Sequence, residues 1–144
     1  MPPTASSEPL GEQPGFARGS SVVAGAWTLA LEAYRGSANG HPAASVEHPA
    51  ITARLLHDAG YDETTVASAV LHDVIEDTGL DRAIVAERCG EEIARRVAAL
   101  TEDDGIAAYA ERKAELRARS IAAGPDVAAV MAADKLARAH FRSW

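Results

Sequence analysis

The segment 71–77, which reads LHDVIED, places one imidazole and three carboxylates within seven residues. In a helix, His72 and Glu76 lie one turn apart on the same face, and so do Asp73 and Asp77. Imidazole and carboxylate groups together bind divalent metal ions, and a carboxylate close to such an ion can orient or deprotonate a water molecule. We predict that His72 and Asp73 are metal ligands and that Glu76 and Asp77 are acid/base groups.

Two further polar residues lie where apolar side chains are expected. His48 stands one turn before Ile51 and Leu55, on the apolar line of a predicted helix. Asp134 falls close to the middle of the apolar face of the last predicted helix, which is formed by Val127, Val130, Met131 and Phe141. A buried carboxylate is costly unless it pairs with a charge or binds a metal.

One metal ion would satisfy the four groups that face inward or border an apolar face: His48, His72, Asp73 and Asp134. This set contains no thiolate and leaves coordination positions open, so it suits manganese, iron, zinc or cobalt and permits chemistry. Two alternatives remain. Asp134 could form a salt bridge with Arg54 or Arg138, and His48 could be a hydrogen-bonded core residue.

The elements that must position these groups are all predicted to be helices. Hydrophobic residues make up 47% of the chain but aromatic residues only 5%, and no segment shows the alternation of a strand. Glycine, proline and capping residues delimit helices at residues 21–35, 47–59, 62–78, 82–89, 91 onward, 106–123 and 126 onward. We predict an all-α, single-domain bundle of about six to seven helices over residues 21–144, after a disordered tail at residues 1–20.

Charge and cysteine content limit the expected partners. The formal net charge of −7 repels nucleic-acid polymers, although a local basic site or a bound metal can still hold a phosphate. The single cysteine, Cys89, cannot form an intramolecular disulfide, which fits the cytoplasm. The apolar run 22–31 is too short to span a membrane. So small a bundle could complete its core by forming a homodimer.

Five segments carry a more specific pattern, in which LHDVIEDT is followed by a helical ADKL. They are EHPAITARLL (47–56), AVLHDVIEDTG (69–79), CGEEIARRVAALTE (89–102), YAERKAEL (109–116) and MAADKLAR (131–138). Over residues 28–138 the chain resembles the HD-domain metal-dependent phosphohydrolases. Within them it is most similar to the (p)ppGpp hydrolases of the RelA/SpoT type, including their small single-domain members.

The resemblance implies an activity and a set of roles. A divalent metal ion, usually manganese in that branch, would be held by His48, His72, Asp73 and Asp134. Glu76 and Asp77 would act on the hydrolytic water. The expected reaction is attack of water on a phosphate or pyrophosphate ester of a nucleotide, most like that of a guanosine-3′,5′-bis(diphosphate) 3′-pyrophosphohydrolase.

Four basic side chains are expected to offset the charge of the substrate: Arg112, Lys113, Lys135 and Arg138. Arg112 and Lys113 match a basic pair that follows an aromatic residue in the branch, although a solvated helix face would look the same. Asn39 and Gly40 stand where the branch has an Arg-Lys pair, and Arg138 stands where it has an Asn. Another nucleotide or a phosphomonoester is therefore an alternative substrate, and a non-catalytic metal- or nucleotide-binding module is an alternative function.

Overall fold

The computed structural model of the 144-residue chain describes residues 13–36 and 42–142, whose regular secondary structure is entirely helical. The predicted all-α fold is therefore confirmed. The helices are α1 (Gly15–Arg18), α2 (Ser21–Arg35), α3 (Pro42–Asp58), α4 (Glu63–Leu71), α5 (Val74–Thr78), α6 (Arg82–Cys89), α7 (Glu91–Ala99), α8 (Tyr109–Ala122) and α9 (Pro125–Arg142). Within the described residues, none of these helices is long and apolar enough to cross a membrane.

Helix α4 lies at the centre of the packing. It contacts α2, α3, α7 and α9, and every residue from 65 to 71 is buried. Leu71, Val66 and Val70 are among the largest side chains that are almost completely removed from solvent. Helix α4 ends at Leu71, directly before His72. The packing of α4 therefore fixes the position of the His-Asp pair.

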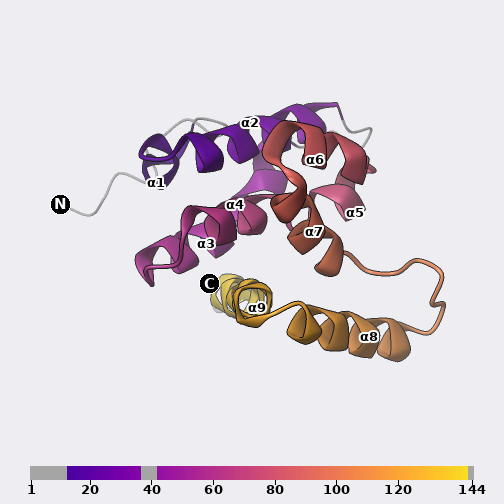
Figure 1. Cartoon of the computed structure of the whole chain (residues 1–144). Helices are drawn as coiled ribbons and strands as arrows, with labels where there is room; N and C mark the ends of the chain where they lie inside the picture. The colour runs from indigo at the N-terminus through magenta and orange to yellow at the C-terminus, as the bar shows by residue number, and fades with distance from the viewer. Residues whose placement is uncertain (1–12, 37–41, 143–144) are drawn as a thin grey trace.

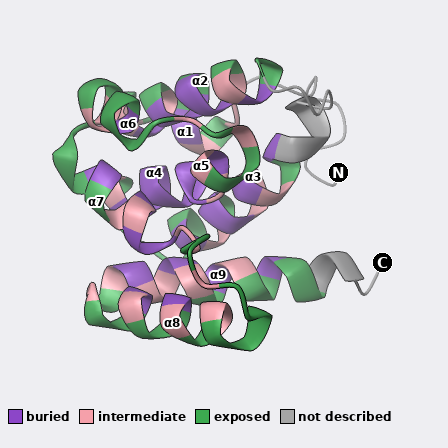
Figure 2. Cartoon of the chain, turned by 90° about the vertical axis from the view of Figure 1, so that its right-hand side faces the viewer, coloured by how far each residue is buried: buried purple, intermediate pink, exposed green. Residues whose placement is uncertain are grey.

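Helices α8 and α9 lie along one side of the bundle that the preceding helices form (Figures 1 and 2). Helix α9 packs against α3 and α4, and α8 packs against α9. A long loop, visible in Figure 1, connects α7 to α8. Figure 2 shows that most of α8 is exposed or half-buried, in keeping with its outer position. This arrangement carries Asp134 on α9 towards the helix that bears His48.

Side-chain caps confirm three of the predicted helix starts. Ser20, Asp62 and Asp81 each accept a hydrogen bond from a backbone N–H two or three residues further on, at 3.2, 2.9 and 2.9 Å. Such caps satisfy N–H groups that have no partner within the helix. The starts of α2, α4 and α6 therefore follow from local sequence.

Several helix starts differ from the prediction, and α8 begins at Tyr109 rather than at residue 106. Helix α1 lies within the predicted tail, because Ala17 is buried and Phe16 packs against the core. Residues 1–12 of that tail lie outside the described residues. Helix α3 begins at Pro42 rather than at residue 47. Proline is favoured in the first turn of a helix, where Pro42 lies, whereas Pro49 lies inside the helix.

The continuous helix predicted at residues 62–78 is wrong, because it is interrupted after Leu71. His72 and Asp73 form a junction between α4 and α5. At this junction the N–H of His72 bonds to the carbonyl of Ala69, only three residues back, at 3.4 Å. This tighter turn ends α4 before the His-Asp pair. Asp73 is then the N-cap of the short helix α5, which carries Glu76 and Asp77.

Candidate metal centre

Three parts of the chain bring the four predicted metal ligands together: His48 on α3, His72 and Asp73 at the junction of α4 and α5, and Asp134 on α9. One ligand atom of each residue lies within 4.8 Å of those of the others. Nε2 of His48 and Nε2 of His72 are 2.5 and 3.0 Å from the same oxygen of Asp134, Oδ1. Oδ2 of Asp73 lies 3.2 Å from Nε2 of His72 and 4.0 Å from Nε2 of His48. All four side chains thus converge on one point.

His72 is the most deeply buried member of this cluster, with 4% of the residue exposed. Its Nδ1 lies 2.5 Å from the carbonyl oxygen of Ala69. A carbonyl oxygen can only accept, so Nδ1 carries the hydrogen and donates it. When the ring is neutral, Nε2 therefore offers a lone pair to the cluster. A backbone carbonyl in this position is typical of metal-binding histidines, whose ring orientation it fixes.

The two carboxylates determine the protonation of the cluster. Burial lowers the pKa of His72, but the charge of Asp73 and the hydrogen bond to Asp134 outweigh it and raise this pKa to about 10. Burial raises the pKa values of Asp73 and Asp134, but the charge of His72 and the histidine hydrogen bonds lower both below their ordinary values. The ionised carboxylates of Asp73 and Asp134 are therefore stabilised by a positive charge nearby. A proton on His72 can supply it, and a divalent cation can replace that proton.

Arg138 contacts the same carboxylates. Its Nε lies 3.2 and 3.3 Å from the two oxygens of Asp134, and its Nη2 lies 3.9 Å from Oδ2 of Asp73. This is the salt bridge that the sequence suggested as an alternative, whereas Arg54 pairs with Asp58 on its own helix. The salt bridge with the exposed Arg138 does not explain why the imidazoles of His48 and His72 both contact one oxygen of Asp134. A metal ion bound by all four side chains explains this arrangement better.

Glu76 and Asp77, the predicted acid/base residues, lie on α5 and are each held by a group from another part of the chain. The backbone N–H of Glu102 donates to Oε1 of Glu76, and the hydroxyl of Tyr34 donates to Oδ2 of Asp77 at 2.9 Å. Burial raises the pKa of both carboxyls, and the hydrogen bond opposes this in each case. The charge of Asp73 also raises both pKa values. A carboxylate with a raised pKa is suited to accept a proton.

A cleft of about 460 Å³ lies between α8 and α9 and reaches the cluster of predicted metal ligands at Asp134. Four cationic side chains line it: Lys113, Arg117, Lys135 and Arg138. Tyr109 and Met131 contribute apolar surface to the same cleft. An acidic chain thus concentrates positive charge next to this cluster of predicted ligands, where an anionic ligand would be stabilised.

Three of the four predicted substrate-binding residues line this cleft, whereas Arg112 has other contacts. Its Nε donates to Glu102 at 3.2 Å, and its Nη1 donates to two backbone carbonyls of the loop before α8. Arg112 therefore anchors that loop. Arg117 lines the cleft but was missed in the sequence. It follows Lys113 by four residues, so helical spacing could have identified it.

A family model described as HD domain matches residues 26–142 of the chain. The chain belongs to the HD-domain family. The resemblance inferred from the five sequence segments is therefore confirmed. The four converging residues include the adjacent His72 and Asp73, which are the first two polar residues of the segment LHDVIED.

Relatives of this HD domain carry names that agree with the RelA/SpoT-type branch. A probable GTP pyrophosphokinase of Mycobacterium leprae is 32% identical over 94 residues, which cover 63% of this chain and 12% of the relative. A guanosine-3′,5′-bis(diphosphate) 3′-pyrophosphohydrolase of Aquifex aeolicus is 33% identical over 79 residues, which cover 55% of this chain and 11% of the relative. The HD domain thus spans about a tenth of the length of these relatives.

The fold of this HD domain has a solved counterpart. The structure of a metazoan ortholog of SpoT, described as hydrolysing ppGpp, matches with a TM-score of 0.69 at 23% identity. The match covers 83% of this chain and 68% of that chain. At this identity the comparison supports the helical fold, and the site has to be judged from the residues of this chain.

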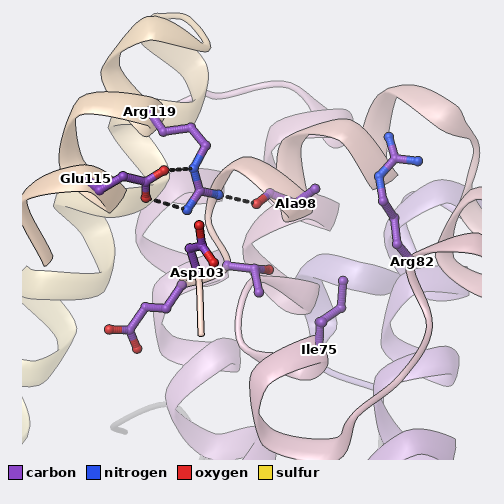
Figure 3. Close-up of a pocket in the computed structure, with 8 residues that line it drawn as sticks. Ile75, Arg82, Ala98, Asp103, Glu115 and Arg119 are labelled. Carbon is purple, nitrogen blue, oxygen red and sulfur yellow. Dashed lines mark hydrogen bonds and ion pairs between the residues drawn. The ribbon is translucent and has the colours of Figure 1, made fainter. Parts of the chain in front are cut away.

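A second cavity of about 460 Å³ is lined by residues of α5, α6, α7 and α8 and by the loop residues Thr101, Glu102 and Asp103. Figure 3 shows Arg119 reaching between Glu115 and the carbonyl of Ala98. Its guanidinium donates to both oxygens of Glu115, at 2.9 and 2.8 Å, and to that carbonyl at 2.7 Å. Arg82, which also lines the cavity, pairs with Glu91. Three carboxylates, Glu102, Asp103 and Glu115, line this cavity, and none of the four predicted metal ligands does. The cleft between α8 and α9 reaches Asp134 and is therefore the better candidate site for an anion.

Proposed function

We propose that this HD domain is a metal-dependent phosphohydrolase that uses water to cleave a phosphate or pyrophosphate ester of a nucleotide. The observation that carries the proposal is the convergence of two imidazoles and two carboxylates within 4.8 Å, beside a cationic cleft. Membership of the HD-domain family and relatives named as pyrophosphohydrolases support the same class of enzyme.

One divalent metal ion fits the donor set of His48, His72, Asp73 and Asp134. Imidazole and carboxylate ligands without a thiolate suit manganese, iron, zinc or cobalt, and we propose manganese. When bound, the ion would polarise a phosphoryl oxygen and lower the pKa of a water molecule. The two carboxylates of the cluster need the positive charge that such an ion brings.

Glu76 and Asp77 are the residues that we propose to act on the attacking water. The water oxygen forms a bond to phosphorus while a carboxylate accepts one of its protons. The bond between phosphorus and the leaving oxygen breaks, and the proton passes to that leaving oxygen. Lys113, Lys135 and Arg138 would offset the negative charge that gathers on the phosphoryl oxygens.

The first substrate that we propose is guanosine-3′,5′-bis(diphosphate), cleaved at its 3′-pyrophosphate. The names of the relatives and the four cations of the cleft, which suit a polyphosphate, support it. The second candidate is another nucleotide or a phosphomonoester. Arg138 favours the second candidate, because the RelA/SpoT-type branch carries an Asn there. So do Asn39 and Gly40, which replace a basic pair of the branch and lie outside the described residues.

A substrate panel tests both candidates. The manganese-loaded chain is incubated with (p)ppGpp, with other nucleoside polyphosphates and with nucleoside monophosphates, and the release of pyrophosphate and phosphate is measured. Pyrophosphate from (p)ppGpp supports the first candidate, and phosphate from a monophosphate supports the second. If the protein holds about one equivalent of metal yet hydrolyses none of these compounds, the proposed function fails and a binding module is favoured.

A homodimer and a cytoplasmic location stay predictions from the sequence. Light scattering at several protein concentrations tests the homodimer, because a dimer dissociates on dilution whereas the mass of a monomer does not change.

A further inference from the structure

The hydroxyl of Tyr34 donates a hydrogen bond to Oδ2 of Asp77 at 2.9 Å, although 43 residues separate the two. Only 3% of Tyr34 is exposed. A buried hydroxyl needs a hydrogen-bond partner, and here the partner is one of the two proposed catalytic carboxylates. The contact joins the last turn of α2 directly to α5.

Helix α5 is too short to hold Asp77 in place by its own hydrogen bonds. It has five residues, with Asp73 as its N-cap and Gly79 as its C-cap in the left-handed conformation, at a φ of 73°. An isolated helix of this length is not stable in water. Helix α2 has 15 residues, buries Trp27 and Leu29 and packs against α5. The larger helix therefore supplies the support that α5 lacks.

Electrostatics determine the direction of this hydrogen bond. Burial, followed by the charge of Asp77, raises the pKa of Tyr34 far above its ordinary value, so the phenol stays protonated and donates. Burial raises the pKa of Asp77, and the bond from Tyr34 lowers it. Other charges act on Asp77 as well, since Asp73 raises its pKa while His72 and Arg138 lower it. Unlike these charged groups, Tyr34 is a neutral hydrogen-bond donor. Its hydrogen bond favours the ionised form of Asp77, which is the form that can accept a proton.

We propose that Tyr34 is a positioning residue, whose hydroxyl holds the carboxylate of Asp77 in the orientation from which it acts on the attacking water. The proposal rests on the proposed function, because Tyr34 acts only through Asp77. The lining of the substrate cleft comes from α8 and α9, whereas Tyr34 belongs to α2. Its effect is therefore on the chemical step rather than on substrate binding.

The variant Tyr34→Phe tests this role, because it keeps the ring and its packing and removes only the hydroxyl. With manganese and the hydrolysed substrate, kcat should fall by about tenfold, as expected for the loss of one hydrogen bond to a charged group. KM and metal content should not change. The acid limb of the kcat–pH profile should move to higher pH, because Asp77 loses a donor that favours its ionised form. Tyr61→Phe, at an exposed tyrosine between α3 and α4, is the matched control and should keep the wild-type kcat.

A double-mutant cycle separates positioning from general destabilisation. Asp77→Asn alone lowers kcat, and adding Tyr34→Phe to it should lower kcat no further. Equal losses in both backgrounds would overturn the proposal. So would a Tyr34→Phe variant with a lower Tm but a wild-type kcat and pH profile, because the hydrogen bond would then serve the fold alone.

An NMR titration of the Asp77 carboxyl needs no substrate and distinguishes failure of this proposal from failure of the proposed function. In Tyr34→Phe the pKa of Asp77 should be higher than in the wild-type protein. If the wild-type protein hydrolyses nothing in the panel, the proposed function fails, while the titration still measures whether Tyr34 controls Asp77. An unchanged pKa overturns the role of Tyr34 even in an active enzyme.

Discussion

Nε2 of His72 lies 3.0 Å from Oδ1 of Asp134, although 62 residues separate the two in the sequence. His72 follows α4, whose burial fixes its position, and Asp134 is carried by α9, which packs against α3 and α4. The packing of three helices therefore assembles the ligand cluster. A site held in this way is preorganised, so little conformational entropy has to be lost when an ion binds.

Asp134→Ala is expected to abolish metal binding, because both histidines of the cluster contact this carboxylate. After growth with manganese and exhaustive dialysis, elemental mass spectrometry should find about one equivalent of metal in the wild-type protein and none in the variant. Asp58→Ala, at an exposed residue of α3, removes the same charge and should keep the metal. Equal metal content in wild-type and Asp134→Ala protein would contradict the four-ligand cluster.

Added manganese should stabilise the wild-type fold and leave that of Asp134→Ala unchanged. An ion at a hundredfold excess over its Kd raises the free energy of unfolding by about 2.7 kcal/mol. The check is Tm by circular dichroism, with and without manganese. A plain helical bundle, in which Asp134 only forms a salt bridge, predicts the opposite pattern: lower stability in the variant and no response to manganese in either protein.

Metal affinity should increase with pH. In the metal-free protein His72 keeps a proton up to a pKa of about 10. The ion has to displace that proton, so the apparent Kd should fall by up to about tenfold per pH unit below this pKa. Calorimetric titrations in two buffers with different ionisation enthalpies measure the released protons directly. An affinity that is independent of pH in this range would show that no proton is displaced.

The stability of the metal-free protein should depend on pH through the same group. The pKa of His72 is raised from its ordinary value of 6.5 to about 10 in the folded protein. Its contribution to the free energy of unfolding is therefore complete below about pH 6.5 and is lost as the pH rises through about 10. Urea unfolding across this window should show the loss in the metal-free protein. The manganese-loaded protein should lose less, because the ion has replaced the proton.

Much of the fold was predictable because short-range rules determine it. Ser20, Asp62 and Asp81 are of residue types that cap helices, and each precedes a segment whose apolar residues recur with helical spacing. The convergence of the candidate ligands was predictable for a different reason: His48 and Asp134 are polar residues on apolar faces, and such residues need partners. Neither inference required knowledge of how the helices pack.

The break after Leu71 could not be predicted, because residues 62–78 have the pattern of one continuous helix. The ring of His72 bonds back to Ala69 and also meets Asp134, and the second of these contacts comes from a distant helix. The contacts of Tyr34 with Asp77 and of Glu102 with Glu76 were equally hidden, since they join residues 43 and 26 positions apart. Long-range packing decides such contacts.

Glu76→Gln is expected to lower kcat by about 100-fold or more, because the amide cannot accept a proton. Its side-chain oxygen can still accept the N–H of Glu102, so Tm and metal content should stay close to those of the wild-type protein. The assay is kcat on the substrate found in the panel. Glu87→Gln, at an exposed residue of α6, is the control for the change in charge. An active Glu76→Gln enzyme would remove Glu76 from the mechanism and leave Asp77 as the only proposed base.

Arg117→Ala should raise KM more than it lowers kcat, because Arg117 lines the cleft and the ligand cluster is formed by other residues. An increase of about fivefold at low salt is expected for one partly solvated charge that faces a polyanion. The increase should shrink as salt is added, because ions screen the interaction. Arg95→Ala removes the same charge from α7, where Arg95 pairs with Glu92, and should leave KM unchanged. Equal effects of the two variants would mean that the net charge of the chain, rather than the cleft, attracts the substrate.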